Sequence, residues 1–265
     1  MAAVGESRIT YDARGLVEID GTPPGVAEIS DGKATFDARD LTTRKINAEL
    51  RRLVYEEGVT DVTIANPGAK HSLGVGILTR CRITFDGSLG YFGCGLIDGP
   101  EIHVKGRVGW SACENMMSGV VVIDGNAGSL TAAAIRGGDV VVHGRVGART
   151  GIDQKGGTII DCGDSGSMNG FMMQRGRMVI CGNAGKNLGD SMYDGTINIG
   201  GEPASLGVDA VWAEMTDLDR KWLERKLRQY DLLPKSGIGH FRKIVAGKQL
   251  WNYDNLEPTE KKMVL

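Results

Sequence analysis

The sequence predicts an all-β fold: a parallel β-helix of about seven coils with a common period, with an N-terminal capping helix and a C-terminal helix plus extended tail. Three observations predict the β-helix. A glycine recurs at a constant interval of 19 positions (106 − 87 = 19) from Gly87 to Gly201, a short β-branched run precedes each of these glycines, and no segment between them has the length or period of a helix. A period near 20 that is kept without insertions is typical of a solenoid.

The glycines form columns one period apart. The first column consists of Gly87, Gly106, Gly125, Gly144, Gly163, Gly182 and Gly201. A second column, three residues later, consists of Gly90, Gly109, Gly128, Gly147, Gly166 and Gly185, and a third of Gly151, Gly170 and Gly189. Glycine is needed where a coil turns a tight corner and where the backbones of successive coils pass closely. We therefore interpret these glycines as structural.

Strands are predicted just before the first glycine column. The runs are Ile102–Val104, Val121–Ile123, Val140–Val142, Ile159–Asp161, Met178–Ile180 and Ile197–Ile199. β-Branched residues bounded by glycines are typical of strands. The glycines before them, where the chain must turn without a Cβ, are Gly119, Gly138, Gly157, Gly176 and Gly195. Because equivalent residues of successive coils stack about 4.8 Å apart, an inward column of small side chains is expected, namely Leu89, Val108, Ala127, Val146, Ser165 and Ala184.

Residues 1–60 form the N-terminal segment and cap. Two short pieces, Ser7–Tyr11 and Ala34–Phe36, have strand-like patterns. From Thr43 to Glu57 the pattern predicts an amphipathic helix that ends at a glycine. Its apolar face is Ile46, Leu50, Leu53 and Val54, and its polar face is Arg44, Lys45, Glu49 and Arg52. We expect this helix to cover the open end of the β-helix, because a terminal coil needs a cap over its unpaired edge.

Residues 61–207 form the β-helix itself. Val62–Ile64 begins the first coil and Asn66–Gly68 turns its corner. The segment Ala69–Gly76 departs from the repeat, and departures on a regular scaffold are where specific surfaces tend to be built. Pro203 lacks the N–H that a strand ladder needs, so pairing is expected to end there.

Residues 208–265 form the C-terminal region. A second helix is predicted over Asp217–Tyr230, because Thr216 and Asp219 have the spacing of a capping box. Its expected apolar face is Leu218, Trp222, Leu223 and Leu227. The tail Phe241–Tyr253 mixes aromatic and cationic side chains. Two interpretations of this tail stay open: it folds back on the β-helix, or it is an arm that becomes ordered on a partner.

The composition excludes several classes of function. The net charge of −2, without a basic stripe, gives no electrostatic basis for binding nucleic acid. No apolar run approaches the length of a membrane span, and Met1–Glu6 lacks the charged and apolar regions of a signal peptide. We therefore expect a cytoplasmic protein with no nucleic-acid or membrane partner.

The five cysteines include two pairs one period apart, and they are Cys81, Cys94, Cys113, Cys162 and Cys181. A stacked pair could form a disulfide or half of a metal site, but a reducing compartment favours buried free thiols. The cysteine spacing contains no C-x-x-C, so an iron–sulfur cluster in this chain is not indicated.

No catalytic, cofactor-binding or metal-binding residue is predicted in this chain. The segment Gly163–Gly166 is G-D-S-G, as in the nucleophile loop of trypsin-like serine proteases, but Ser165 falls in the inward column and no triad partners are placed for it. His103 and His143 belong to different columns, so they should not converge on a metal. The glycine repeat lacks the lysine and the helix of a phosphate-binding loop. Six methionines indicate either soft packing or a partner-facing patch, and they are Met116, Met117, Met168, Met172, Met173 and Met192.

Together, the helix Thr43–Gly58, the segment Asn66–Gly74 and the coils with G-x-x-G-x-x-x-G resemble the glycine-repeat domain of the glutamate synthase large subunit. The resemblance covers roughly residues 40–205. It implies a right-handed β-helix without catalytic residues, packed between a glutamine amidotransferase domain and an FMN-containing synthase domain, that supports the passage of ammonia between them.

As a short separate chain, the protein is similar to the stand-alone subunits of glutamate-synthase-like complexes, including the B subunit of N-methylglutamate synthase. This similarity implies a scaffold subunit whose partners are a glutamine amidotransferase-like subunit and an FMN-containing synthase subunit. FMN, and iron–sulfur clusters where the complex has them, would belong to the synthase partner. The sequence does not choose between ammonia and methylamine as the amine.

Two other functions stay open. The C subunits of formylmethanofuran dehydrogenase and of the formyltransferase/hydrolase complex share this glycine repeat, and would make the chain a scaffold for one-carbon transfer. Alternatively, the chain is an independent binding solenoid that presents one flat face. The helix before the coils and the segment Asn66–Gly74 favour the glutamate synthase resemblance.

Overall fold

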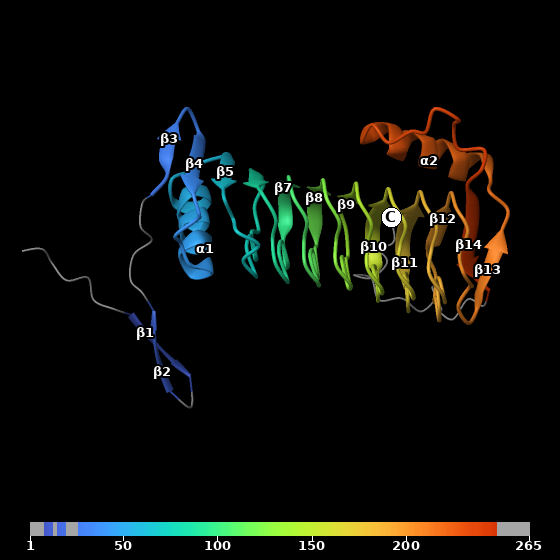
Figure 1. Ribbon diagram of the computed structural model, residues 1–265, viewed down its shortest axis with the longest axis horizontal. Helices are drawn as coiled ribbons and strands as arrows, with labels where there is room; N and C mark the ends of the chain where they lie inside the picture. Colours follow the sequence, from blue (N-terminus) through green and yellow to red (C-terminus); the bar gives the residue numbers. More distant parts are fainter. Residues whose placement is uncertain (1–7, 13–14, 20–25, 248–265) are drawn as a thin grey trace, which may run out of the picture.

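A computed structural model describes residues 8–12, 15–19 and 26–247 of the chain (Figure 1). Strands β1 and β2 pair antiparallel in a small sheet of their own. The other strands form one 12-stranded sheet in the order β13-β14-β12-β11-β10-β9-β8-β7-β6-β5-β4-β3. The body of the protein is a parallel β-solenoid of about seven turns, which confirms the predicted fold class.

The strands before the repeat are β1 (Arg8–Asp12), β2 (Gly15–Ile19), β3 (Glu28–Ser30) and β4 (Lys33–Asp37). The strands of the coils are β5 (Asp61–Ala65), β6 (Arg82–Asp86), β7 (Asp98–Val104), β8 (Ser118–Ile123), β9 (Asp139–Val142), β10 (Lys155–Asp161), β11 (Arg175–Ile180) and β12 (Thr196–Ile199). Two more, β13 (Ala210–Ala213) and β14 (Arg242–Ala246), follow the repeat.

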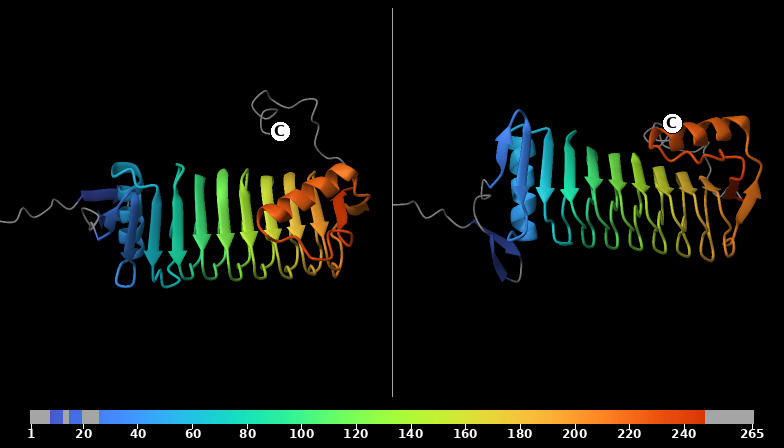
Figure 2. Two further views of the ribbon diagram at one scale, coloured as in Figure 1. Left: turned by 90° about the horizontal axis from the view of Figure 1, so that it is seen from above. Right: turned by 45° about the horizontal axis from the view of Figure 1, so that its top comes forward.

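The period of the sequence sets the register of the sheet. Ile102 pairs with Val121 and Val121 with Val140, and both pairs are parallel. Figure 2 shows the strands stacked as successive rungs along the long axis. On the second side of each coil a single parallel bridge joins neighbours, through Val108, Ala127, Val146, Ser165 and Ala184. These residues are buried, so the predicted inward column is confirmed.

On the third side of each coil, every second residue has a left-handed backbone conformation. Ser111, Cys113 and Asn115 have φ of 57°, 59° and 55°, and the same positions have positive φ in the neighbouring coils. The left-handed region costs an L-residue about 1–2 kcal/mol. Hydrogen bonds between coils hold it here, since Ser111 donates to the Ser129 carbonyl and Cys113 to the Gly93 carbonyl, both at 2.9 Å. The third glycine column therefore lies where the backbone favours glycine.

The sheet begins one rung earlier than predicted. β4 pairs in parallel with β5, and Ala34 lies opposite Val62. The segment Ala34–Phe36, expected only as a strand-like piece outside the coils, is thus the first parallel rung. The connection from β4 to β5 contains the predicted helix and is longer than one period, so this rung was hidden from the periodic pattern.

The N-terminal helix closes the open end of the solenoid. It comprises α1 (Thr43–Arg51) and a π-helical turn, η1 (Arg52–Glu56), and its residues Ile46, Leu50 and Leu53 are fully buried in the core. The Asn47 side chain donates to the Ser72 carbonyl at 2.7 Å and accepts from the Gly74 N–H at 2.9 Å. A side-chain amide therefore replaces the missing neighbouring coil, which confirms the predicted cap.

One assignment on this helix was wrong. Glu49 was expected on the polar face, but it is fully buried. Its carboxylate accepts from the Arg52 guanidinium at 2.9 and 3.0 Å and from the Ala27 N–H at 3.1 Å. Ala27, directly before β3, lies on this side of the helix, and Arg52 supplies the positive charge that a buried carboxylate needs.

The C-terminal helix covers the outer face of the sheet. α2 (Asp217–Gln229) begins with the predicted capping box of Thr216 and Asp219. Its side chains Leu223 and Leu227 are fully buried and pack in one cluster with Val141, Ile160 and Val179, which point outward from β9, β10 and β11. Leu218, expected on this apolar face, is instead 78% exposed, because it lies in the first turn on the side away from the sheet.

The C-terminal end of the solenoid also differs from the prediction at Pro203. Pairing continues past it, through bridges of Ala184 to Pro203 and of Leu188 to Leu206. The N–H of Ala184 in this column donates to the following coil, whereas no coil of the described residues follows Pro203, so the missing N–H of proline is tolerated there.

The tail folds back on the solenoid as far as it is described. β14 (Arg242–Ala246) is inserted antiparallel between β12 and β13, with Ile244 opposite both Ile197 and Trp212. The first part of the predicted tail Phe241–Tyr253 therefore forms an inner strand of the sheet. Its remaining residues, 248–253, lie outside the described part of the chain.

Candidate partner-binding surface

A furrow runs across the N-terminal ends of the stacked strands because a column of glycines lies there. Gly119, Gly138, Gly157, Gly176 and Gly195 all have positive φ, between 67° and 107°. A Cβ built on Gly119 would lie 2.3 Å from the Pro100 carbonyl oxygen, and one on Gly138 would lie 2.4 Å from that of Gly119. Backbone conformation and coil spacing both require glycine here. Since these positions carry no side chains, the surface above them is hollow.

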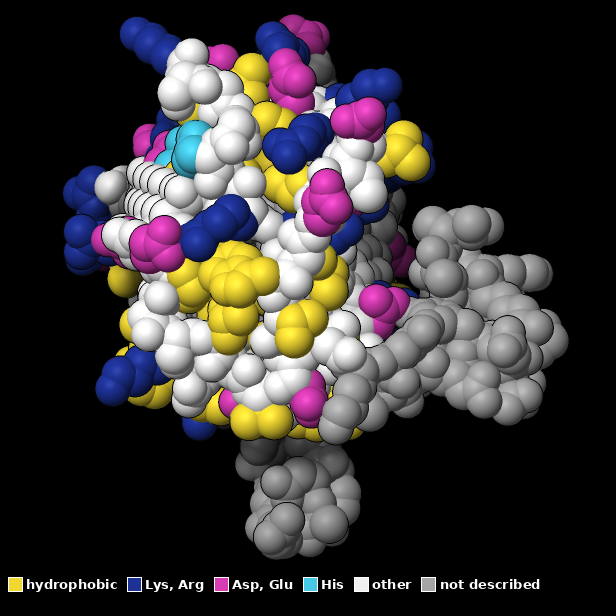
Figure 3. All heavy atoms as spheres, turned by 90° about the vertical axis from the view of Figure 1, so that its right-hand side faces the viewer, with side chains coloured by type: hydrophobic (Ala, Val, Ile, Leu, Met, Phe, Trp, Pro, Cys, Tyr) yellow, Lys and Arg dark blue, Asp and Glu magenta, His cyan; other side chains and the backbone are white. Residues whose placement is uncertain are grey.

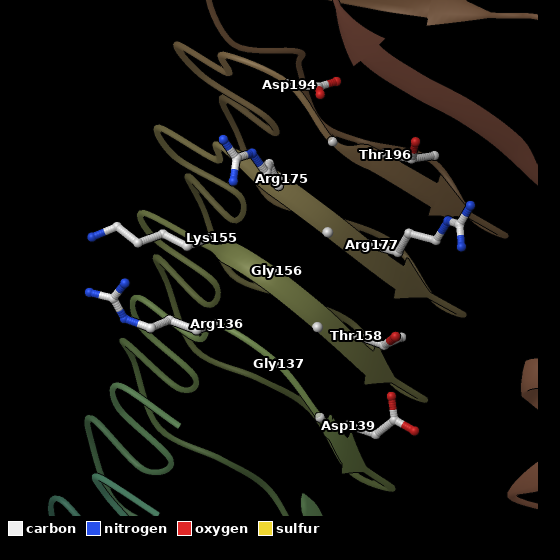
Figure 4. A pocket seen from close by; sticks show the side chains of 14 residues that line it. Arg136, Gly137, Asp139, Lys155, Gly156, Thr158, Arg175, Arg177, Asp194 and Thr196 are labelled. Atoms are coloured by element: carbon white, nitrogen blue, oxygen red, sulfur yellow. The ribbon is translucent and has the colours of Figure 1, made fainter. Parts of the chain in front are cut away.

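The furrow opens into two grooves. The groove in the C-terminal half has a volume of about 670 Å³ and that in the N-terminal half about 610 Å³. In Figure 4, Arg136, Lys155 and Arg175 project on one side of the glycine floor of the C-terminal groove, and Asp139 and Arg177 lie on the other.

The C-terminal groove is basic. Four basic side chains line it, Arg136, Lys155, Arg175 and Arg177, against two acidic ones, Asp139 and Asp194. The N-terminal groove instead has three of each sign, and Arg82 there lies 3.8 Å from Asp61 and 3.5 Å from Glu101. Among its lining residues the C-terminal groove has two more basic than acidic side chains, although Lys155 also lies 3.1 Å from Asp153, and it is the half better suited to an acidic ligand.

Helix α2 and its C-cap contact two of the residues that line the basic groove. Lys226 donates to Asp139 at 2.7 Å, and the Tyr230 hydroxyl also donates to that carboxylate. Burial, together with the bond to Asp139, raises the pKa of Tyr230, so its hydroxyl stays protonated. Asp139 is thus neutralised within the protein. The Arg177 guanidinium lies 4.3 Å from the centre of the Trp222 ring, and burial lowers the pKa of Arg177.

A second feature is an exposed ladder of three aromatic rings. The rings of His71 and Tyr91 stack 4.6 Å apart at 11°, and those of Tyr91 and Trp110 stack 5.5 Å apart at 24°. Tyr91 is 51% exposed and Trp110 56%. The ladder depends on glycine, because a Cβ on Gly109 would lie 2.6 Å from Tyr91 and one on Gly128 would lie 2.6 Å from Trp110.

The ladder was not predicted, although the sequence contains its signal. Tyr91 and Trp110 are one period apart, and His71 precedes Tyr91 by one position more than a period, since the first coil is longer. The next positions of this column are Ser129 and Ala148, so the ladder ends at Trp110. Three exposed aromatic side chains in one row form an apolar strip suited to protein contact.

The irregular segment Ala69–Gly76 is used mainly inside the protein. Lys70 donates to the Ala38 and Arg39 carbonyls at 3.0 and 3.3 Å. Ser72 and Gly74 are held by α1 through Asn47. The departure from the repeat therefore fastens the N-terminal cap, and only His71 contributes to the aromatic ladder.

The C-terminal end of the solenoid is a third candidate contact area. β13 is the last strand of the sheet, and its residues Val211 and Trp212 are 43% and 44% exposed. Val208, just before β13, is 66% exposed. Figure 3 shows hydrophobic side chains gathered on this end of the molecule. An exposed sheet edge beside apolar side chains is a common site for a partner strand.

The residues considered for chemistry are placed as follows. Ser165 is buried in the inward column. His103 pairs in register with Val122, and Val122 pairs with Val141, whereas His143 comes two residues after Val141. The two histidines therefore lie in different columns, as predicted. In the part of the chain that the structure describes, no cluster of three or more His, Cys, Asp and Glu could hold a metal ion. All five cysteines are free, and burial raises the pKa of Cys94 to about 12.

The methionines do not form a single patch. Met116, Met173 and Met192 are fully buried, as expected for soft packing. Met117 is 46% exposed, whereas Met168 and Met172 are half-buried. Core filling therefore accounts for half of the six.

No protein-family model matches the chain, and no curated protein matches it in sequence. Neither helix of the described part has the length and apolar character that crossing a bilayer requires.

Proposed function

We propose that the chain is a non-catalytic scaffold subunit of a glutamate-synthase-like complex. Its partners would be a glutamine amidotransferase-like subunit and an FMN-containing synthase subunit, which together make glutamate or N-methylglutamate in the cytoplasm. FMN, and any iron–sulfur cluster, would be bound by the synthase partner.

The observation that carries this proposal is the unit formed by the segments that bear the resemblance. Helix α1 and the segment Asn66–Gly74 are joined through Asn47, Ser72 and Gly74, and they cap the glycine-repeat coils directly. The three features that resemble the glutamate synthase domain therefore form one contiguous structure. The basic groove, the aromatic ladder and the apolar end of the solenoid supply separate surfaces for more than one partner.

Affinity purification from the native cell tests this proposal. We expect an amidotransferase-like chain and a yellow synthase chain with the absorbance spectrum of flavin to co-purify, and assays with ammonia and methylamine would then identify the amine. Recovery of formyl-transferring chains would instead assign the protein to a one-carbon complex. Recovery of the colourless chain alone would support an independent binding solenoid.

The contribution of the aromatic ladder can be measured in the same complex. Replacing Tyr91 and Trp110 with serine, which occupies the same column at Ser129, should leave folding intact. If the ladder is central to an interface, the loss should be about 2 kcal/mol or more, or about 30-fold in partner affinity. Leu218→Ser, at another exposed apolar site, is the matched control. Unchanged affinity of the double variant would exclude the ladder from the interface.

A further inference from the structure

One coil of the solenoid has a polar interior. The inward side chains of this coil are Ile159, Asp161, Ser165, Asn169 and Met173, and all are buried. At the same positions of the next coil they are Met178, Ile180, Ala184, Leu188 and Met192, which are also buried. Three consecutive inward positions that are apolar in the next coil are therefore polar in this one.

Each of these three polar side chains is inside the protein, and two of them are anchored at one end. Asp161 is 1% exposed, and its Oδ1 accepts from the Gly163 N–H at 3.1 Å. Asn169 is fully buried, and its Oδ1 accepts from the Thr150 N–H at 2.9 Å. These bonds fix one oxygen of each side chain against the backbone and leave the other polar atom of each in the interior.

Within the described part of the chain, the remaining polar atoms of these side chains have no hydrogen-bond partner. They are Oδ2 of Asp161, Oγ of Ser165 and Nδ2 of Asn169, joined by Oε1 of Gln154 in the preceding coil. Almost all buried polar atoms in native proteins are hydrogen-bonded, either to protein or to ordered water. Four such atoms in two adjacent coils therefore indicate a bound molecule rather than four separate defects.

The chemistry of these atoms selects the ligand. Burial raises the pKa of the Asp161 carboxyl to about 8, so at neutral pH this group is protonated and can donate. The Asn169 amide donates, the Gln154 oxygen accepts, and the Ser165 hydroxyl can do both. The ligand must therefore both donate and accept. It must also be uncharged, since Val142 and Ile180 lie on either side of Asp161 in the same column.

The available space is small. Asp161 and Asn169 fill less volume than Ile180 and Leu188 in the same columns of the next coil, because their terminal oxygen and nitrogen atoms are smaller than methyl groups. The chain turns at Gly163 between Asp161 and Ser165, so their side chains enter the interior from two adjacent sides of one coil. Water is the molecule that meets these requirements of size, neutrality and mixed hydrogen bonding.

We propose that the coil of residues 159–173 encloses a buried water site, in which ordered water molecules bind Asp161 Oδ2, Ser165 Oγ and Asn169 Nδ2. Gln154 Oε1 extends this site into the preceding coil. The site is a property of the isolated chain and does not depend on the proposed partners.

A high-resolution crystal structure of the full chain tests the proposal. We expect electron density for water within hydrogen-bond distance of at least two of the three atoms. In Ser165→Ala, which copies Ala127 and Ala184 of the same column, the water bound to Oγ should be lost while the fold is kept. Ala127→Ser is the matched control, because it adds a hydroxyl to the same column between Val108 and Val146 of the neighbouring coils, and it should bind no water in the interior.

A second variant separates water binding from folding. Asp161→Ile with Ser165→Ala and Asn169→Leu copies the next coil, and should give a dry interior and a higher melting temperature. If the triple variant does not fold, the structures of the wild type and of Ser165→Ala still decide. An interior without water in the wild type, or density for a larger molecule, would overturn the proposal.

Discussion

A Cβ built on Gly166 would lie 2.5 Å from the backbone nitrogen of Ala148 in the preceding coil. On Gly147 it would lie 2.4 Å from that of Ser129. Neither glycine has positive φ, so the requirement comes from the spacing of the coils rather than from conformation. At the scale of the residue, each position is thus restricted by its counterpart one period away.

Gly166→Val and Gly147→Val should therefore prevent normal folding, because backbone cannot move aside as a flexible side chain can. Circular dichroism and the yield of soluble protein measure this. Gly239→Val is the control, since a Cβ there would meet nothing within 4 Å, and it should melt like the wild type. A Gly166→Val protein with wild-type stability would show that the coils are less closely packed than described.

Asp161 makes stability depend on pH. Its folded-state pKa of about 8 is above its ordinary value of 3.8, mainly because burial disfavours the charged form. Between these two values the unfolded chain has lost this proton while the folded chain keeps it. Stability should therefore fall by about 1.4 kcal/mol per pH unit as pH rises through this range, and then level off.

Asp161→Asn removes this titration while keeping the size of the side chain. The difference in melting temperature between Asp161→Asn and wild type should be small near pH 4.5 and should grow in favour of the variant up to about pH 8. Thermal melts at several pH values measure it. A constant difference across this range would mean that Asp161 is ionised in the folded protein.

At the scale of the element, the two helices perform different tasks. α1 closes an end, where it supplies hydrogen bonds to an unpaired coil through Asn47. α2 covers a face, where Leu223 and Leu227 bury the outward residues of three strands. The first helix therefore replaces backbone pairing, and the second adds a second apolar core.

Asn47→Ala should leave the Ser72 carbonyl and the Gly74 N–H without partners. A loss of about 1–3 kcal/mol in the free energy of unfolding is expected, because unsatisfied groups near a buried coil carry their full desolvation cost. Denaturant titration measures it. Glu56→Ala, an exposed change in the same helical segment, serves as the control and should stay within about 0.5 kcal/mol of wild type. An equal effect of both changes would argue against the capping role of Asn47.

At the scale of the whole molecule, the regular glycine columns produce a long furrow whose two halves differ in charge. Only the C-terminal half has an excess of basic side chains, and it lies beside α2. A scaffold with a basic groove, an aromatic ladder and an apolar end can hold different partners on different surfaces. Within the proposed complex, we expect an acidic segment of one partner to occupy the basic groove.

Arg136→Glu should then weaken binding of that partner and reduce its dependence on salt, because an attractive charge is replaced by a repulsive one. The loss should be about tenfold or more at low ionic strength, as measured by titration of the purified subunits. Arg145→Glu is the control, because the Arg145 side chain is also well exposed, at 73%, but lies away from the groove. Equal losses for both variants would show that net charge, not the groove, controls binding.

The sequence by itself determined the solenoid, because the same physical requirement recurs in every coil and each recurrence is visible. The glycine columns, the inward column through Val108 and Ser165, and the capping helix could all be predicted in this way. The sequence also showed that Ser165 is a polar residue in an otherwise apolar inward column. It did not show that Asp161 and Asn169 are buried in the same coil.

Only the tertiary structure decided the contacts that occur once. β14 returns to pair with β12 after a long excursion of the chain, so that Arg242 lies opposite Ile199 with no periodic signal linking the two. Other contacts likewise depend on which surface a segment meets in three dimensions. Examples are the burial of Glu49, the exposure of Leu218 and the packing of α2 on β9, β10 and β11. A repeat specifies its neighbours by its period, whereas a single long-range contact is specified only by the packing of the folded chain.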